Sequence, residues 1–278
     1  MEKTLYLNES ATLHIIKDGP SIVVKEGEKS ARRVPARMIQ RVVIVGNMKL
    51  ESGLITLFTQ NNIPVTFLDK RGNQIAVTLP CRQYLPEHYQ TQKVFLESDY
   101  TIRRFMTFLR AYRQQVQVDV LKRLLKSQMP DKYITVGLRE EEYQQTIDNA
   151  SSRHRGEFQQ IHNAISAIFL EMVVSRLIAA NLDPHLGVMH RRRDFGLALD
   201  ICHVLGPEMD IQAIQCLGGK KVSGHQTQHE ISSEEMKAIA VRFENRKEVL
   251  ITMTEHILDG IFELIRELRI SGEYGITL

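Results

Sequence analysis

The sequence lacks tryptophan, has few cysteines and contains no long uninterrupted apolar run. The absence of tryptophan excludes no class of protein. The three cysteines, Cys81, Cys202 and Cys216, are scattered and form no C-x-x-C pair. This excludes a disulfide framework and a zinc ribbon, and it favours reduced thiols in a cytosol. No apolar run reaches the length of a membrane span, and the opening MEKTLYLNES lacks the apolar core of a signal peptide. We therefore expect a cytoplasmic protein with no membrane partner.

A strong charge of either sign is also missing, since the net charge of the 278 residues is only +3. A chain of this length buries a sizeable core and forms one or two domains. The weak positive balance permits a nucleic acid as partner without requiring one. Local basic clusters must therefore carry any argument for DNA binding.

The first part of the chain, residues 1–79, is predicted to be rich in β-strands. Short apolar runs recur there between turn signals such as the D-G-P sequence at 18–20. A stretch with helical character at 52–60 interrupts them and is stopped by Asn61 and Pro64. No polar cluster indicates a catalytic site in this part. We expect a small β-sandwich that is structural or that forms a dimer, because the edges of a sheet favour pairing.

The rest of the chain is predicted to be helical. Residues 80–97, with two prolines and many polar side chains, form a connector, and residues 98–278 form the larger domain. The expected fold class is α+β, with an N-terminal β-sandwich followed by a larger all-helical domain. A helix at about 100–127 has apolar residues at helical spacing and a basic opposite face. That face either follows DNA phosphates or is a solvated helix surface. Its cationic residues are Arg103, Arg104, Arg110, Arg113, Lys122, Arg123 and Lys126.

The densest chemistry lies in residues 163–210. An apolar helix is predicted to end at Asn181, a residue that favours the left-handed region at a helix C-terminus. After a short loop with His190 and three arginines, a second apolar helix carries Asp200 and His203 on one face. An imidazole and a carboxylate that converge beside cations can hold a divalent metal next to a phosphate. The other interpretation is a capped helix pair with a surface histidine.

This stretch resembles the signature of the CRISPR-associated adaptation endonuclease/integrase family, the Cas one family. The family pattern G-L-D-P-x-x-G-x-x-H, a basic loop and L-A-x-D-L-M-E-x-x-R-P-x-x-D stands here as NLDPHLGVMH, RRRDFG and LALDICHVLGPEMD. Two positions depart, since His203 stands in place of the second acidic residue and Gly206 in place of the arginine. The positions that match in register are Leu182, Asp183, Pro184, Gly187, His190, Leu197, Ala198, Asp200, Pro207 and Asp210.

The resemblance implies a protein of CRISPR adaptation. Such a protein is a metal-dependent DNA endonuclease/integrase that inserts spacer DNA into a CRISPR array by attack of a 3′-OH on a phosphodiester. His190 and Asp200 match catalytic metal ligands of the family, and Mg²⁺ or Mn²⁺ is the implied cofactor. The implied partners are spacer and repeat DNA, a second copy in a homodimer, and the small ferredoxin-like adaptation protein. The alternative is a catalytically weakened member that acts as a DNA-binding scaffold.

The remaining metal ligands are less well defined. The family's E-G-x-A-A-x-x-Y phrase, which supplies a metal-binding glutamate, is absent here. Glu141 is the first choice for that ligand and Glu157 the second, with Glu140 and Glu142 also open. His203 stands in an acidic position, and imidazole is a poorer ligand for Mg²⁺ than carboxylate. A site with this residue would favour Mn²⁺ or bind metal weakly.

Two further basic groups are candidates for DNA contact. Arg191, Arg192 and Arg193 would neutralise phosphates beside the metal. Lys220 and Lys221, in a basic glycine-rich loop, are DNA-binding candidates together with Arg103 and Arg104. In the same loop, His225 and His229 have the spacing of a zinc pair on a helix, although the surrounding small residues argue against a helix there. A capping box at 232–235 is expected to open the last helices, at 236–243 and 249–268.

Overall fold

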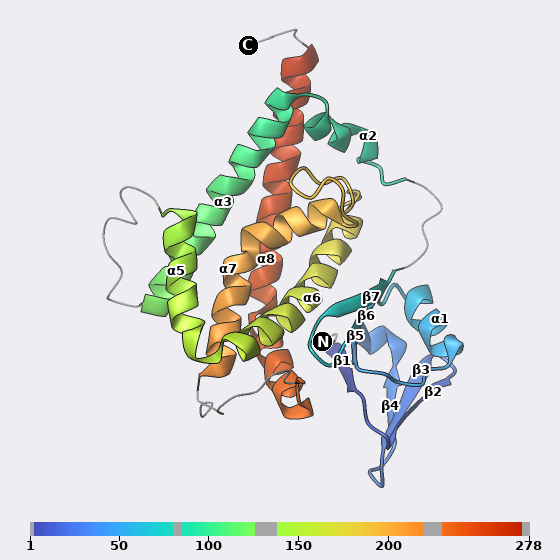
Figure 1. The fold of residues 1–278 in the computed structure, drawn as a ribbon. Coiled ribbons are helices and arrows are strands. Elements are labelled where there is room, and N and C mark those ends of the chain that lie inside the picture. Colours follow the sequence, from blue (N-terminus) through green and yellow to red (C-terminus); the bar gives the residue numbers. More distant parts are fainter. Residues whose placement is uncertain (1–2, 80–84, 126–137, 219–229, 274–278) are drawn as a thin grey trace.

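The computed structural model describes residues 3–79, 85–125, 138–218 and 230–273. Cys81, Lys126, Lys220, Lys221, His225 and His229 lie outside these ranges. Two β-sheets and one helix form the N-terminal part, and the long helices form the rest (Figure 1). β-Sheets followed by a helical region confirm the predicted α+β class.

The larger sheet has the strand order β1-β5-β6-β7, in which β1, β5 and β6 are parallel and β7 is antiparallel. The smaller sheet is an antiparallel meander of β2, β3 and β4. The strands are β1 Lys3–Asn8, β2 Leu13–Asp18, β3 Ser21–Glu26, β4 Arg32–Pro35, β5 Ile39–Val45, β6 Val65–Leu68 and β7 Gln74–Thr78. Sequence reasoning missed β4, because its residues R-R-V-P are mostly polar and end in proline, unlike a typical strand.

Strand β5 is buried along almost its whole length because apolar groups cover both faces of the larger sheet. Val43 and Val45 pack into the helical core, whereas Val42 and Ile44 pack into a second core with α1. Helix α1 spans Ser52–Gln60, as predicted, and Asn62 follows it in the left-handed region. The larger sheet thus has the helical core on one side and α1 with the smaller sheet on the other.

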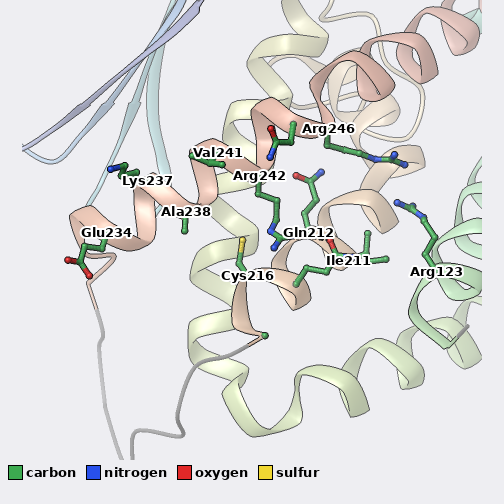
Figure 2. Close-up of a pocket in the computed structure, with 13 residues that line it drawn as sticks. Arg123, Ile211, Gln212, Cys216, Glu234, Lys237, Ala238, Val241, Arg242 and Arg246 are labelled. Carbon is green, nitrogen blue, oxygen red and sulfur yellow. Dashed lines mark hydrogen bonds between the residues drawn. The ribbon is translucent and has the colours of Figure 1, made fainter.

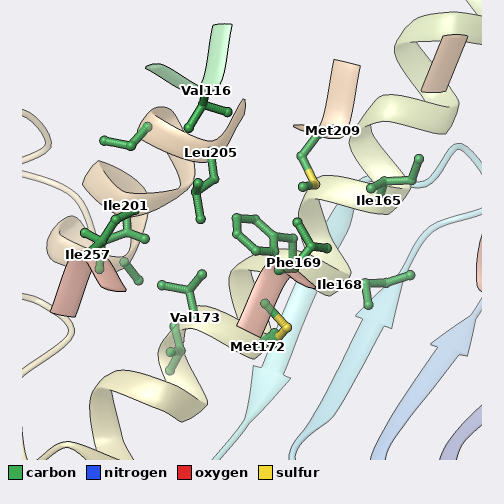
Figure 3. Packing of buried hydrophobic residues seen from close by; sticks show 14 of the residues in the cluster. Val116, Ile165, Ile168, Phe169, Met172, Val173, Ile201, Leu205, Met209 and Ile257 are labelled. Atoms are coloured by element: carbon green, nitrogen blue, oxygen red, sulfur yellow. The ribbon is translucent and has the colours of Figure 1, made fainter. Parts of the chain in front are cut away.

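Among the described residues, the helical region is built from five long helices and a few short turns (Figure 1). Its elements are α2 Tyr89–Gln92, η2 Lys93–Leu96, α3 Asp99–Leu125, α5 Glu140–Ser151, η4 Ser152–His154, α6 Arg155–Ala179, α7 Gly196–Leu217 and α8 Ser233–Glu273. A further 3-10 turn, η1 Ala36–Met38, lies between β4 and β5. Helix α6 is buried on most sides, as its sequence predicts, and Phe169 and Val173 pack near Ile201 and Leu205 of α7 (Figure 3).

Three of the long helices exceed their predicted bounds. Helix α6 begins at Arg155, eight residues before the stretch 163–210 in which the sequence places it. Helix α7 continues past Asp210 to Leu217 because Ile211 and Ala213 are buried in the core. Helix α8 is continuous, since Phe243, Lys247 and Leu250 keep a buried face through the polar segment that sequence reasoning had placed between two helices. Its start is confirmed: Ser232 and Glu235 exchange the two hydrogen bonds of a capping box.

One helical stretch in the described part, Glu140–Ala179, is long and apolar enough to span a membrane by length and composition. Sequence reasoning had found no such run. Within the fold, 61% of its most apolar window is buried against other elements. This is the pattern of a core helix, and the membrane signal is weak.

A buried ion pair connects the sheet to the helices. Arg41 on β5 is 3% exposed and Glu171 on α6 is 1% exposed, and Nε of the arginine lies 3.4 Å from Oε2 of the glutamate. The guanidinium also lies 5.9 Å from the centre of the Phe243 ring. Glu171 accepts a second contact from Ser175 Oγ at 2.8 Å. Because a lone buried charge is costly, this pair fixes how the two regions dock.

Candidate functional site

The loop of residues 181–195 folds back onto the first turn of α7. Asn181 has a φ of 56°, which confirms the predicted left-handed end of α6. The Pro184 carbonyl accepts hydrogen bonds from the backbone N–H of Leu197 and Ala198 at 2.9 and 3.2 Å. These N–H groups belong to the first turn of α7, where backbone N–H groups have no acceptor within the helix. A Cβ on Gly187 would lie 2.2 Å from the carbonyl carbon of Gly196, so only glycine allows this close approach.

Asp200 holds the end of this loop. Its side chain is 0% exposed. Oδ2 accepts the backbone N–H groups of Val188 and Met189 at 2.6 and 3.2 Å, and Oδ1 accepts the N–H of His190 at 3.0 Å. Oδ1 also lies 2.8 Å from Nδ1 of His190. A carboxylate has about four acceptor positions, so all of those on Asp200 are taken.

The contact with Asp200 sets the chemical form of His190. Because the carboxylate accepts, Nδ1 carries the hydrogen of that bond, and in the neutral ring Nε2 keeps its lone pair. The side chain is 26% exposed, and Nε2 makes no hydrogen bond to any described residue. A carboxylate behind a histidine in this way fixes the tautomer and the orientation of the ring. His190 is therefore oriented to accept a proton or to bind a metal at Nε2.

Next to this pair, helices α3, α5 and α7 surround a hollow of about 570 Å³. His203 reaches it from α7, and Met189 reaches it from the loop beside His190. Burial lowers the pKa of His203, and the charges of Arg113 and His190 lower it further. The lowered pKa favours the neutral ring, which makes no hydrogen bond to the described residues. The other lining residues are Met106, Leu109, Arg110, Arg113, Gln114, Gln117, Leu138, Arg139, Glu140 and Glu141.

On the α5 side of the hollow, Glu140 is bound by Arg113 of α3. Arg113 Nε donates to Oε2 at 3.0 Å and Nη2 donates to Oε1 at 2.5 Å, which is the two-pronged geometry of a strong arginine–carboxylate pair. Gln117 Nε2 also donates to Oε2, at 2.7 Å. The hydrogen bond from Arg113 lowers the pKa of Glu140. The glutamate side chain is 51% exposed and that of Arg113 is 13% exposed.

The third contact of Arg113 is with a backbone carbonyl that a proline leaves without a helical partner. Pro207 lies inside α7 and has no N–H, so the carbonyl of His203, four residues earlier, has no helical partner. Arg113 Nη1 donates to that carbonyl. Gly206 leaves the space for it, since a Cβ at this position would lie 3.3 Å from Nη1. The glycine that departs from the family pattern therefore admits an arginine from another helix.

The candidate glutamates lie at different distances from this hollow. Glu140 and Glu141 line it, and Glu142 accepts the backbone N–H of Arg139 at 3.4 Å in the capping box of α5. Glu157 is near His154, with 3.8 Å between Oε2 and Nδ1.

Helix geometry places Glu157 far from His203. His162 of α6 is 3.2 Å from Asp210 of α7 in the antiparallel pair, and Glu157 and His203 lie on opposite sides of this contact. A rise of about 1.5 Å per residue puts them about 18 Å apart along the helices. The structure therefore brings Glu140 and Glu141 to the site, and not Glu157.

The described residues do not form a ready site for Mg²⁺. They contain no group of three or more His, Cys, Asp or Glu side chains that could hold a metal as they lie. The oxygens of Asp200 are occupied by N–H groups, and those of Glu140 by Arg113 and Gln117. The donors without a partner among the described residues are the imidazoles of His190 and His203, which suit Mn²⁺ better than Mg²⁺, and the exposed carboxylate of Glu141. A divalent ion could use an oxygen of Glu140 only after Arg113 releases it.

Several of the proposed DNA-binding arginines lie at the surface. Arg192 and Arg193 are exposed and make no ion pair with the described residues. Arg191 donates to the Leu96 carbonyl at 3.4 Å. On α3, Arg103 is exposed, and Arg104 forms an ion pair of 3.1 Å with Glu267. Arg192 and Arg193 of the loop and Arg103 of α3 are therefore available for phosphates.

We expect the variant carrying both Arg192→Gln and Arg193→Gln to bind duplex DNA more weakly at low salt. Each phosphate contact adds about one to the slope of log affinity against log salt, so the slope should fall by about 2. Fluorescence anisotropy across a salt series measures both quantities. The matched control is Lys17→Gln with Lys25→Gln, which removes two exposed charges from the smaller sheet. Equal slopes for the wild type and the loop variant would contradict a role in phosphate binding.

A second hollow, of about 720 Å³, lies between α7 and α8, and sequence reasoning did not find it (Figure 2). Arg123, Arg242 and Arg246 line it. Two of these arginines are already bound to Glu208, a carboxylate that is 1% exposed: Arg246 lies 3.2 Å from it and Arg123 also contacts it. Arg242 donates to Gln215 at 2.8 Å. These contacts connect α3, α7 and α8, and each of the three arginines already has a partner.

Most residues of the sequence signature serve the fold. Leu182, Leu197 and Ala198 are completely buried. Asp183 accepts the N–H of His185 at 2.8 Å in a turn. Asp210 accepts a hydrogen bond of 2.7 Å from Tyr143 and lies beside His162. Among the signature positions, His190 combines partial exposure with an open nitrogen.

Comparison with known proteins identifies the fold and the family. The family model described as CRISPR associated protein Cas1 matches residues 5–169, which is more than half of the chain. No curated protein matches the sequence. The matched range ends before the loop at 181–195, so the arrangement of the site rests on the geometry described above.

Solved structures support the same fold. A CAS1 protein from Thermotoga maritima aligns with a TM-score of 0.71 and 18% identity over 96% of this chain and 97% of that one. A casposase bound to its integration product aligns with a TM-score of 0.74 and 15% identity over 96% and 91%. A Cas6-RT-Cas1–Cas2 complex contains a chain that aligns with a TM-score of 0.64 and 16% identity, over 97% of this chain but 35% of that one. With the family match, these likenesses lead to one conclusion: the chain belongs to the Cas1 family of CRISPR-associated proteins.

Proposed function

We propose that this protein joins the 3′ end of spacer DNA to a CRISPR repeat. The single observation that carries the proposal is the His190–Asp200 pair, a partly exposed imidazole backed by a buried carboxylate at the edge of a hollow lined with arginines. Cas1 proteins act as metal-dependent nucleases and integrases, and one structural relative was solved bound to an integration product. The same chemistry is our proposal for this chain.

The reaction is a transesterification. The 3′-OH of the spacer attacks a phosphorus of the repeat, a P–O bond forms to the spacer, and the P–O bond to the 3′ oxygen of the repeat breaks. His190 Nε2 accepts the proton of the attacking hydroxyl, and Asp200 stabilises the charged ring and holds its orientation. Arg192 and Arg193 hold the DNA backbone. The displaced 3′ oxygen receives a proton from water or from the protonated imidazole.

A second candidate function is a DNA-binding scaffold that works with an active copy. The contacts between Arg113, Gln117 and Glu140 favour it, because they occupy the carboxylate oxygens of Glu140. In both cases we propose a cytoplasmic homodimer that uses the β-rich residues 1–79 as its interface. The chain in the Cas6-RT-Cas1–Cas2 complex works with Cas2, and we propose a small partner of that kind here.

We expect His190→Gln to reduce strand transfer by about 100-fold or more, the usual contribution of a proton-transfer group. The glutamine amide can still donate to Asp200, but it has no basic nitrogen. The assay follows transfer of a labelled duplex into a plasmid that carries a repeat, in Mn²⁺ and in Mg²⁺. The control is His14→Ala, an exposed histidine on β2. If His190→Gln transfers at the wild-type rate, His190 is not the base, and if the wild type binds DNA without transfer, the scaffold function holds.

A further inference from the structure

We propose that Arg113 is a phosphate-binding residue that controls whether Glu140 can hold a divalent ion. The proposal rests on the proposed function, since the phosphate is that of the DNA substrate. In the DNA-free protein, the guanidinium of Arg113 is the cation that neutralises Glu140. When a DNA phosphate takes Arg113, the carboxylate becomes available to a metal.

The contacts of Arg113 allow this exchange of partners. Nη1 is fixed to the His203 carbonyl that Pro207 leaves unpaired, so one end of the guanidinium stays on α7. The Nε and Nη2 edge faces the carboxylate of Glu140. This edge binds carboxylate and phosphate with the same parallel geometry, so a phosphate oxygen pair can replace Glu140 without moving the anchored end.

The hollow beside Arg113 is accessible to a phosphate from solvent. Arg113 and Glu140 both line the hollow of about 570 Å³, and half of the Glu140 side chain is open to solvent. Arg110 lines the same hollow, is exposed and makes no ion pair with the described residues. A DNA strand that meets Arg110 first would bring a phosphate next to Arg113. Gln117 and His203 then remain beside the released carboxylate.

The exchange couples two ligands. Phosphate and metal each favour the arrangement in which Arg113 has left Glu140, so each raises the affinity for the other by the same factor. Without Arg113, the metal would no longer need the phosphate. The fold of the site thus makes metal binding depend on the presence of substrate.

The experiment is a Mn²⁺ titration of the purified full chain, followed by the electron paramagnetic resonance of free Mn²⁺. It is run without DNA and with a short duplex, and the duplex-only titration is subtracted. For the wild type, we expect the duplex to raise Mn²⁺ affinity at least tenfold. For Arg113→Met, Mn²⁺ affinity without DNA should already be raised at least tenfold, and the duplex should add less than threefold. The control Arg37→Met removes an exposed cation from the η1 turn, away from the hollow, and should keep the large response to the duplex.

A second variant tests the proposal if Arg113→Met does not fold. Glu140→Gln releases Arg113, so it should bind duplex DNA at least threefold more tightly than the wild type, and Mn²⁺ should no longer change that affinity. An unchanged Mn²⁺ affinity in Arg113→Met, or weaker DNA binding by Glu140→Gln, would overturn the proposal. Strand transfer is not read in these titrations. Failure of the proposed function would leave the coupling intact, and failure of the coupling would leave strand transfer to be judged by its own assay.

Discussion

Replacing Asp200 with asparagine is expected to lower the free energy of unfolding by about 3–5 kcal/mol. The buried carboxylate accepts three backbone N–H groups and the ring of His190. An asparagine offers one acceptor oxygen, and its NH₂ group would face N–H donors. At least two donors would lose their partner in a buried place, at about 1–3 kcal/mol each. Chemical denaturation followed by circular dichroism measures the loss.

The matched control is Asp194→Asn, an exposed aspartate in the same segment. It should change the free energy of unfolding by less than about 0.5 kcal/mol, as surface substitutions usually do. A stability of Asp200→Asn close to that of the wild type would show that the loop at 188–190 does not depend on the carboxylate. The orienting role given to Asp200 would then be wrong.

Replacing Arg41 with methionine is expected to cost a similar amount, about 3–5 kcal/mol, because Glu171 would remain buried without its cation. Both side chains are almost fully buried, and they join β5 to α6. The double variant Arg41→Met with Glu171→Leu replaces the pair by apolar groups. It should recover most of the loss, since such replacements are often neutral or stabilising. A double variant as unstable as the single one would contradict the ion-pair explanation.

The cost of Arg41→Met should also depend on pH. Burial raises the pKa of Glu171 above its ordinary value of 4.5, and Arg41 opposes that rise. Without Arg41 the pKa in the folded state rises further, so folding favours the protonated acid. The penalty is then largest above the raised pKa of the variant and shrinks as the pH falls toward the pKa of the wild type, below which Glu171 is protonated in both folded proteins. Denaturation at pH 5 and pH 8 measures the difference, and an equal cost at both values would contradict this account.

Local signals in the sequence predicted the parts of the fold that local chemistry determines. The end of α6 at Asn181, the bounds of α1 and the capping box at Ser232 each depend on neighbouring residues. The lengths of α7 and α8 depend on burial against other helices. The local sequence does not show this burial, and the polar segment within α8 looks like a break between two helices. Strand β4 forms through pairing with β3, and its own residues do not favour a strand.

The contacts of the candidate site also divide into those that the local sequence predicted and those that depend on distant residues. The spacing in the sequence predicted that His190 folds back onto Asp200 because the loop between them is short, and the structure shows their contact. The pairing of Glu140 with Arg113 was not predicted. Gly206 and Pro207 gave a signal, since they leave a space and an unpaired carbonyl on α7. The arginine that fills the space comes from 90 residues earlier, and no local pattern identifies such a partner.

The central claim is that this protein joins a spacer 3′-OH to a phosphodiester of the repeat. The most direct measurement compares two labelled duplexes that differ only in the 3′-terminal sugar, one with a 3′-OH and one with a 3′-deoxy end. Products with the repeat plasmid are separated on a denaturing gel and their junctions are sequenced. We expect covalent junctions from the 3′-OH duplex, each at a 3′ end of the spacer, and none from the 3′-deoxy duplex. Equal products from both duplexes, or no junction from either while DNA is bound, would contradict the claim.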